Sequence, residues 1–187
     1  MNRHFFGHDK TRHGESPSRR PALTGSKTGS SDAATTVKVL NQALLIAHIT
    51  VLRCKRQYRL ALRHHSPPLA ADALEHANEA KLQGDRITER ILQLGGKPDK
   101  SPDALPHHTR TEQEEKDPVM AAIAELRLAA RAAVESYHEF AGFFAPFDPI
   151  TRNLIEDVAA GEQERANELA RLRGQLSDQP ERAGSMV

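Results

Sequence analysis

Histidine and carboxylate side chains that could bind a metal ion lie close together in the first half of the chain. Glu75, His76 and Glu79 fall within about one helical turn, and imidazole and carboxylate groups suit ions such as iron and zinc. No histidine follows Glu79 at the third position, so the cluster lacks the Glu-x-x-His spacing that places two ligands on one helix face. A site built from His48, His76 and Glu79 would need two helices to face each other, and the sequence leaves that hypothesis open.

Other residue types that often carry chemistry give weaker signals. Most remaining histidines are better explained as solvated residues of the N-terminal segment, a helix end and a Pro-rich connection: His4, His8, His13, His64, His65, His107 and His108. The single cysteine, Cys54, excludes an internal disulfide framework and leaves cytoplasm as the default compartment. The sequence contains no Gly-rich phosphate loop, nucleophile motif or internal repeat.

Bulk properties favour a soluble protein with one domain. The 187 residues are enough for a sizeable core, and a net charge of +1 requires neither nucleic acid nor a membrane as partner. No apolar run approaches the roughly 20 residues of a membrane helix, and the N-terminus lacks the apolar region of a secretory signal. We therefore expect a cytoplasmic protein without membrane contact.

The elements that would position any site are four amphipathic helices. Apolar residues recur at alternating steps of three and four, a period typical of helices packed nearly parallel in a bundle. The pattern predicts helices over residues 34–64, 69–94, 117–144 and 149–176. The predicted core-facing seams are Leu40, Leu44, Ala47, Val51, Cys54 and Tyr58; Ala73, Ala77, Ala80, Gly84, Ile87, Ile91 and Leu94; Ile123, Leu126, Ala130, Ala133, Tyr137, Phe140 and Phe144; and Leu154, Val158, Gly161, Glu162, Arg165, Leu169 and Leu172.

Start and stop signals separate these helices. Asp117 and Asp148, each followed by proline, predict capped helix starts, and Gly95 with Gly96 predicts a glycine stop. Residues 95–116 are too long for an ordinary bundle connection and fit a crossover that runs the length of the bundle. We therefore predict an all-α four-helix bundle over 34–176, a disordered and mildly basic tail over 1–33, and a C-terminal tail over 177–187.

Several stretches resemble the bacterioferritin-like branch of the ferritin superfamily. The resemblance covers roughly residues 38–175 and is carried by LNQALLIAHITVLRCKRQYRLA, LEHANEA, GDRITERILQLGGKPDKSP, ESYHEF and DPITRNLIEDVAAGEQERANEL. It implies a ferritin-like bundle with one long crossover between the second and third helices. In that family a di-iron ferroxidase centre inside the bundle takes one Glu from helix one, one from helix three, and a Glu-x-x-His pair from helices two and four.

The resemblance implies that this di-iron centre is degenerate here. It places the six ligand positions at Ala47, Ala80, Gln83, Ala130, Glu162 and Arg165. Only Glu162 could bind iron, so five of the six positions are substituted and we expect neither a ferroxidase centre nor a catalytic residue. Glu162 and Arg165, three residues apart, could instead form a buried ion pair with Gln83 as a further hydrogen-bond partner, and Arg165 would then occupy the space of the iron. The alternative is that Arg165 extends to solvent.

A haem group is not expected either. Bacterioferritins similar to this chain can bind haem between two subunits through a methionine of helix two, and Lys81 stands at that position. Met120, in the first turn of the third helix, is no substitute. The sequence therefore predicts no cofactor.

The sequence and the resemblance together suggest three alternative functions. The first is a non-catalytic structural or regulatory subunit related to iron storage, forming a homo-oligomer or a hetero-oligomer with an active ferritin-like subunit. The second is an iron-storage or iron-binding bacterioferritin that uses a displaced site or partner subunits, with iron as its ligand. The third is a DNA-associated protein, like starvation DNA-protection relatives, whose basic N-terminal arm contacts phosphates.

Overall fold

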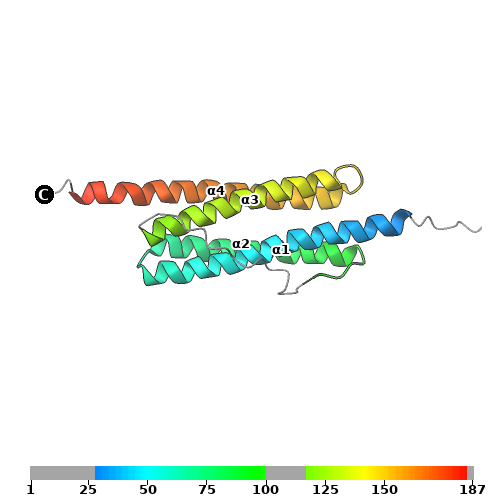
Figure 1. Cartoon of the computed structure of the whole chain (residues 1–187), viewed down its shortest axis with the longest axis horizontal. Helices are drawn as coiled ribbons and strands as arrows, with labels where there is room; N and C mark the ends of the chain where they lie inside the picture. Colours follow the sequence, from blue (N-terminus) through cyan, green and yellow to red (C-terminus); the bar gives the residue numbers. More distant parts are fainter. Residues whose placement is uncertain (1–27, 100–116, 185–187) are drawn as a thin grey trace, which may run out of the picture.

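Four long helices make up the described part of the chain, which covers residues 28–99 and 117–184 of this computed structural model. They are α1 (Thr28–Arg63), α2 (Pro67–Gln93), α3 (Pro118–Phe144) and α4 (Pro149–Gly184). Figure 1 shows their axes running side by side, with α4 extending past the other helices at its C-terminal end. The predicted all-α four-helix bundle, with a long connection between its second and third helices, is confirmed.

The helices associate as two hairpins. α1 packs mainly against α2, and α3 packs mainly against α4, while fewer contacts join α1 to α3 and α2 to α4. Short turns close each hairpin, whereas the connection between the hairpins spans residues 94–117. Its first residues lie on α1, since the side chain of Asn41 bonds the carbonyl oxygen of Lys97 and the amide of Asp99.

The helix ends follow the predicted signals. Asp117 accepts a hydrogen bond from the amide of Val119 at 2.8 Å, and Asp148 accepts one from the amide of Thr151 at 3.0 Å. At the end of α2, Gly95 has a φ of +73°. The amides of Gly95 and Gly96 bond back to the carbonyl oxygens of Leu92 and Ile91, which satisfies two otherwise unpaired acceptors.

The outer boundaries differ from the prediction. Residues 1–27 of the predicted basic tail lie outside the described residues, and residues 28–33 belong to α1. At the other end, the predicted tail over 177–187 is helical as far as Gly184. Leu176 explains part of this extension, because it packs against the core and carries the apolar stripe beyond Leu172.

The core consists of two apolar clusters, one towards each end of the bundle. The first contains Leu40, Ala43, Leu44, Ile87, Ile91, Ala133, Tyr137, Ala141, Phe144, Ile155, Val158 and Ala159. The second contains Cys54, Ala61, Leu69, Ala70, Ala77, Ala122, Ile123, Leu126, Leu169 and Leu172. The predicted seams largely supply these residues. In α4, however, Ile155 is buried in place of the predicted Leu154, and Gly161 is exposed.

α1 is more apolar than the sequence analysis indicated. Among the described residues it is the one helix long and apolar enough, by length and composition alone, to cross a membrane, over the 31 residues Ala33–Arg63. The expectation that no segment reaches this threshold is corrected. The apolar content reflects a bundle core helix, since Leu40, Leu44 and Cys54 are completely buried.

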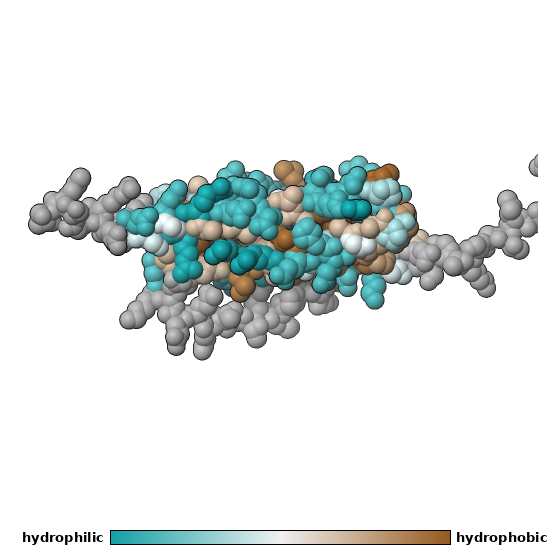
Figure 2. Space-filling model, turned by 90° about the horizontal axis from the view of Figure 1, so that it is seen from above, coloured by the Kyte–Doolittle hydropathy of each residue, from teal (hydrophilic) through white to brown (hydrophobic). Residues whose placement is uncertain are grey.

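The visible surface is mainly hydrophilic. Figure 2 shows a largely polar face on which apolar side chains form small, separate areas. The exposed large hydrophobic residues are Leu52, Leu62, Leu74, Leu82, Leu92, Leu128, Phe147 and Ile150. Single exposed residues of this kind are ordinary for a folded protein.

Gly96 lies where α1 approaches the end of α2. A Cβ atom there would lie 2.5 Å from Cγ2 of Val37, which has no flexible side chain to move away. We expect Gly96→Ala to lower the free energy of unfolding by about 1–3 kcal/mol in chemical denaturation. Gly142→Ala is the control, because Gly142 lies within α3 facing open space. It should raise stability by about 0.5–1 kcal/mol, and equal effects of both changes would contradict this account.

A partly buried ion pair joins the C-terminal half of α2 to the start of α4. Arg90 Nη2 lies 3.0 Å from both carboxylate oxygens of Asp148, and Arg90 Nε donates to the hydroxyl of Thr151 at 2.7 Å. Burial raises the pKa of Asp148, but hydrogen bonds from Thr151 and the charge of Arg90 outweigh it and hold the pKa below its ordinary value. The pair therefore stabilises the fold when Asp148 is ionised.

Asp148→Asn should lower the free energy of unfolding by about 2–3 kcal/mol at neutral pH, because it leaves Arg90 largely buried without its carboxylate. A depressed pKa gives stability that is present above the unfolded-state value of about 3.9 and is lost as the pH falls through the folded-state value. The difference between variant and wild type should therefore shrink below about pH 4. Asp157→Asn, which removes the exposed partner of Arg86, should cost less than about 1 kcal/mol. A cost for Asp148→Asn that does not change with pH would refute this explanation.

Candidate functional site

A layer of small and polar residues separates the two apolar clusters. It contains the six positions that the resemblance singled out: Ala47, Ala80, Gln83, Ala130, Glu162 and Arg165. All four helices contribute, and five of the six residues are buried; Gln83 is partly buried. Glu162 is 1% exposed and Arg165 is 3% exposed. Arg165 therefore does not extend to solvent, and two charged side chains lie in the middle of the bundle.

Arg165 pairs with a residue that the sequence analysis did not single out. Its two terminal nitrogens contact both carboxylate oxygens of Asp72 on α2, one of them at 2.6 Å, and Nη1 lies 3.6 Å from Glu168. The expected ion pair between Glu162 and Arg165 is thus replaced by a forked contact across α2 and α4. The physical reason is geometric, since the planar guanidinium matches a carboxylate that faces it end on.

Glu162 is left with an unusual environment. Neither of its carboxylate oxygens has a hydrogen-bond partner within the described protein. Its charge also reaches neighbouring groups: burial first, and the charge of Glu162 second, raise the pKa of the Tyr137 hydroxyl. Burial likewise raises the pKa of the Cys54 thiol to about 12, with Arg165 opposing and Glu162 adding to that effect. Cys54 therefore remains a thiol at neutral pH.

The side chain that faces Glu162 is His76. Its Nε2 atom lies 3.5 Å from Oε2 of Glu162, and its Nδ1 atom lies 3.7 Å from Oε2 of Glu79. His76 is 3% exposed, and its Nδ1 has no hydrogen-bond partner among the described residues. The sequence pattern suggests a grouping of His76 with Glu79 and His48 but gives no reason to place it beside Glu162. The available signal was its position four residues before Ala80, on the same helix face.

Gln83 completes the polar set on α2. Its Oε1 is buried without a hydrogen-bond partner, and its Nε2 lies 2.9 Å from the position that a Cβ of Gly161 would take. Gln83 therefore packs on the backbone next to Glu162. His48 is only partly buried; its ring lies 3.9 Å from a Cβ built on Gly84. The described contacts do not bring His48 to His76.

This layer does not fit a di-iron centre of the kind implied by the resemblance. The methyl groups of Ala47, Ala80 and Ala130 offer no donor atom, and the guanidinium of Arg165 is a cation with no lone pair to share. Within residues 28–99 and 117–184, no group of three or more His, Cys, Asp or Glu side chains is arranged to hold a metal ion. The layer can instead hold fixed charges in a water-poor interior.

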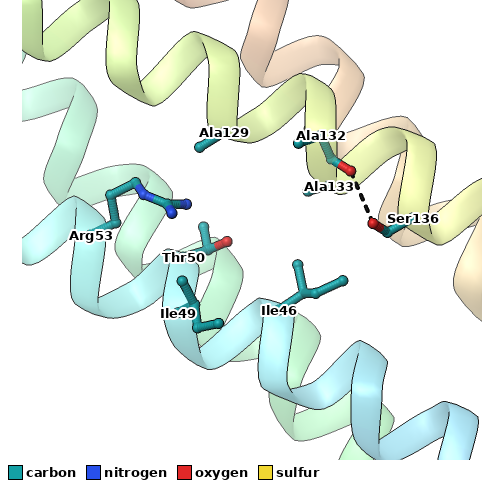
Figure 3. A pocket seen from close by; sticks show the side chains of 8 residues that line it. All are labelled: Ile46, Ile49, Thr50, Arg53, Ala129, Ala132, Ala133 and Ser136. Atoms are coloured by element: carbon teal, nitrogen blue, oxygen red, sulfur yellow. Dashed lines mark hydrogen bonds between the residues drawn. The ribbon is translucent and has the colours of Figure 1, made fainter. Parts of the chain in front are cut away.

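A second polar contact lies beside a shallow groove between α1 and α3. Glu125 accepts hydrogen bonds from Arg56 and, at 2.7 Å, from the buried side chain of Gln57. The groove has a volume of about 170 Å³ and is lined by Ile46, Ile49, Thr50, Arg53, Ala129, Ala132, Ala133 and Ser136. Figure 3 shows Ser136 bonded to the carbonyl oxygen of Ala132, so its hydroxyl is already engaged within α3. The groove is separate from the central polar layer.

The contact between Asp72 and Arg165 gives a direct test of the charge arrangement. Asp72→Asn should lower the free energy of unfolding by about 3–5 kcal/mol, because it strands a buried guanidinium. Replacing both partners, as Asp72→Leu with Arg165→Met, should recover most of that loss. Denaturant titrations of the two variants and wild type measure both quantities. A double variant as unstable as Asp72→Asn would show that the pair is needed in itself.

Known proteins share this four-helix architecture. A family model described as a ferritin-like domain matches residues 37–178. A search of curated proteins gave no match. Among solved structures, bacterioferritin from Desulfovibrio desulfuricans, described with a diiron site in different catalytic states, is similar at 20% identity with a TM-score of 0.70. That match covers 79% of this chain and 83% of that one.

Two further structures share the fold. A mutant of Dps1 from Mycobacterium smegmatis has 17% identity and a TM-score of 0.70, covering 76% of this chain and 97% of that one. Bacterioferritin from Rhodobacter capsulatus, described with a metal-free dinuclear site and heme iron, has 20% identity and a TM-score of 0.66, covering 77% and 86%. At these identities the structures establish the fold alone. The family model, which spans most of the chain, shows that this protein belongs to the ferritin-like family.

Proposed function

We propose that this chain is a ferritin-like subunit without a ferroxidase centre, acting as a structural or regulatory component related to iron storage. The observation that carries the proposal is the chemistry of the central layer. At the six positions where the resemblance places iron ligands, Glu162 is the one carboxylate, and three positions are alanines buried in the interior. A di-iron centre needs carboxylate and imidazole donors from all four helices, which these residues do not supply.

The charge balance of the layer supports the same proposal. Clustered carboxylates repel one another in a low-dielectric interior and need bound cations to compensate. Here Arg165 introduces a fixed positive charge, and Asp72 neutralises it through a two-atom contact. Arg165 and Asp72 neutralise each other, so this pair needs no bound cation.

Assembly is the second part of the proposal. The chain shares its fold with bacterioferritin and Dps1 structures. A subunit that has lost its own catalysis can still contribute surface to a homo-oligomer, or to a hetero-oligomer with an active ferritin-like subunit. Affinity purification from the native host followed by mass spectrometry identifies the companion chain, and mass photometry of the purified protein gives the size of the assembly.

Iron oxidation tests the catalytic part. We expect the purified chain to oxidise Fe²⁺ in air no faster than a buffer control. A variant that restores the family donors should oxidise it faster; its five substitutions are Ala47→Glu, Ala80→Glu, Gln83→His, Ala130→Glu and Arg165→His. This variant shows that the bundle and the assay can report ferroxidase activity. Repeated turnover of Fe²⁺ by the unmodified chain would refute the proposal.

A further inference from the structure

We propose that His76 and Glu162 bind one divalent transition-metal ion of intermediate softness, of which Zn²⁺ is the type, and that this ion joins α2 to α4. The proposal concerns a single ion at a histidine outside the six positions of the family's di-iron set. It does not rest on the proposed function, because a redox-inert ion at this place is compatible with either outcome of the iron-oxidation assay.

The distance between the two donor atoms is the first argument. His76 Nε2 and Glu162 Oε2 are 3.5 Å apart, at the outer limit of a hydrogen bond. Zinc binds histidine nitrogen and carboxylate oxygen at about 2.0–2.2 Å, so two ligands of one tetrahedral ion lie about 3.3–3.6 Å apart. The observed spacing of 3.5 Å falls within the range for two donors that share a tetrahedral ion.

The unsatisfied carboxylate is the second argument. Glu162 is 1% exposed, and neither of its oxygens has a hydrogen-bond partner among the described residues. A buried carboxylate without compensation costs several kcal/mol, about the size of a domain's whole stability margin. The nearby cation, Arg165, pairs with Asp72, and no ion pair between Arg165 and Glu162 occurs among the described contacts.

The outer partner of the histidine is the third argument. A metal-binding histidine commonly directs its second ring N–H to a carboxylate, which fixes the ring and strengthens the ligand. In His76, Nε2 faces Glu162, and the carboxylate of Glu79 lies 3.7 Å from Nδ1, just beyond hydrogen-bond distance. Glu79 is about half exposed and lies three residues along the same helix, the spacing at which two side chains are neighbours on a helix surface.

The remaining coordination would come from neutral oxygen donors. Gln83 lies on the same face of α2 and holds a buried Oε1 with no hydrogen-bond partner. Water can complete the set, since a mixed nitrogen and oxygen environment suits zinc and cobalt. Two strong ligands with neutral oxygens bind more weakly than a closed site of four side chains. The ion would therefore be exchangeable.

Cobalt is a suitable probe, because tetrahedral Co²⁺ absorbs visible light strongly and Zn²⁺ displaces it. The full chain, stripped with EDTA, is titrated with CoCl₂ beside His76→Ala, Glu162→Gln and the exposed-histidine control His138→Ala. We expect wild type and His138→Ala to bind one more Co²⁺ per chain than the other two variants, and Zn²⁺ to abolish the visible bands. Equal binding and equal spectra for wild type, His76→Ala and Glu162→Gln would overturn the proposal, because any metal bound would then lie on other histidines.

Two further measurements keep the test independent of folding defects. Zn²⁺ should raise the Tm of wild type more than that of Glu162→Gln, a variant that conserves shape. Glu79→Gln should weaken Co²⁺ affinity about 10- to 100-fold while leaving the stoichiometry unchanged, as expected of a residue that orients a ligand. If Zn²⁺ shifts the Tm of wild type and Glu162→Gln equally, no ion is bound at Glu162 and the proposal is wrong.

Discussion

The fold is constrained by two charged side chains held in the middle of a helical bundle. Glu162 and Arg165 are almost completely inaccessible, and both lie between the two apolar clusters of the core. A charge in that place must be compensated within a few ångströms, because no bulk water is there to solvate it. Asp72 forms an ion pair with Arg165, and His76 lies opposite Glu162. The two charged residues of α4 therefore each face a polar residue of α2.

This requirement explains why α2 has an asymmetric interior face. Four of its nine buried residues are alanines, with Leu69 and His76 in the N-terminal half and two isoleucines towards the C-terminal end. Small residues let the long side chains of α4 reach across, whereas larger ones would fill the space that Arg165 and Glu162 occupy. Towards α1 the packing is less tight, since a Cβ built on Gly84 would lie 3.6 Å from Ala47, an ordinary van der Waals distance. The small buried residues of α2 thus leave space for the long polar side chains of α4.

The fold could be predicted from the sequence because periodicity and punctuation are local properties. Asp117, Asp148 and Gly95 set helix ends through contacts within a few residues, and the structure confirms each of them. The contacts of the site were harder to predict, because the partner of a charged side chain depends on which helices face each other. Arg165 and Glu162 are near neighbours in sequence, which favoured a pair between them. The structure places Arg165 beside a residue 93 positions away, and spacing along one helix contains no information about that choice.

The arrangement of two hairpins has a consequence for the order of events in folding. Contacts next to the turn of each hairpin are short-range in sequence, whereas those that join the hairpins, such as Arg90 with Asp148 and Arg165 with Asp72, span 58 and 93 residues. Local contacts form faster than distant ones, since less chain entropy is lost before they are gained. The hairpins should therefore form first, and their docking should dehydrate the charged layer last. In the reverse direction, the seam between the hairpins is where water first returns to the interior.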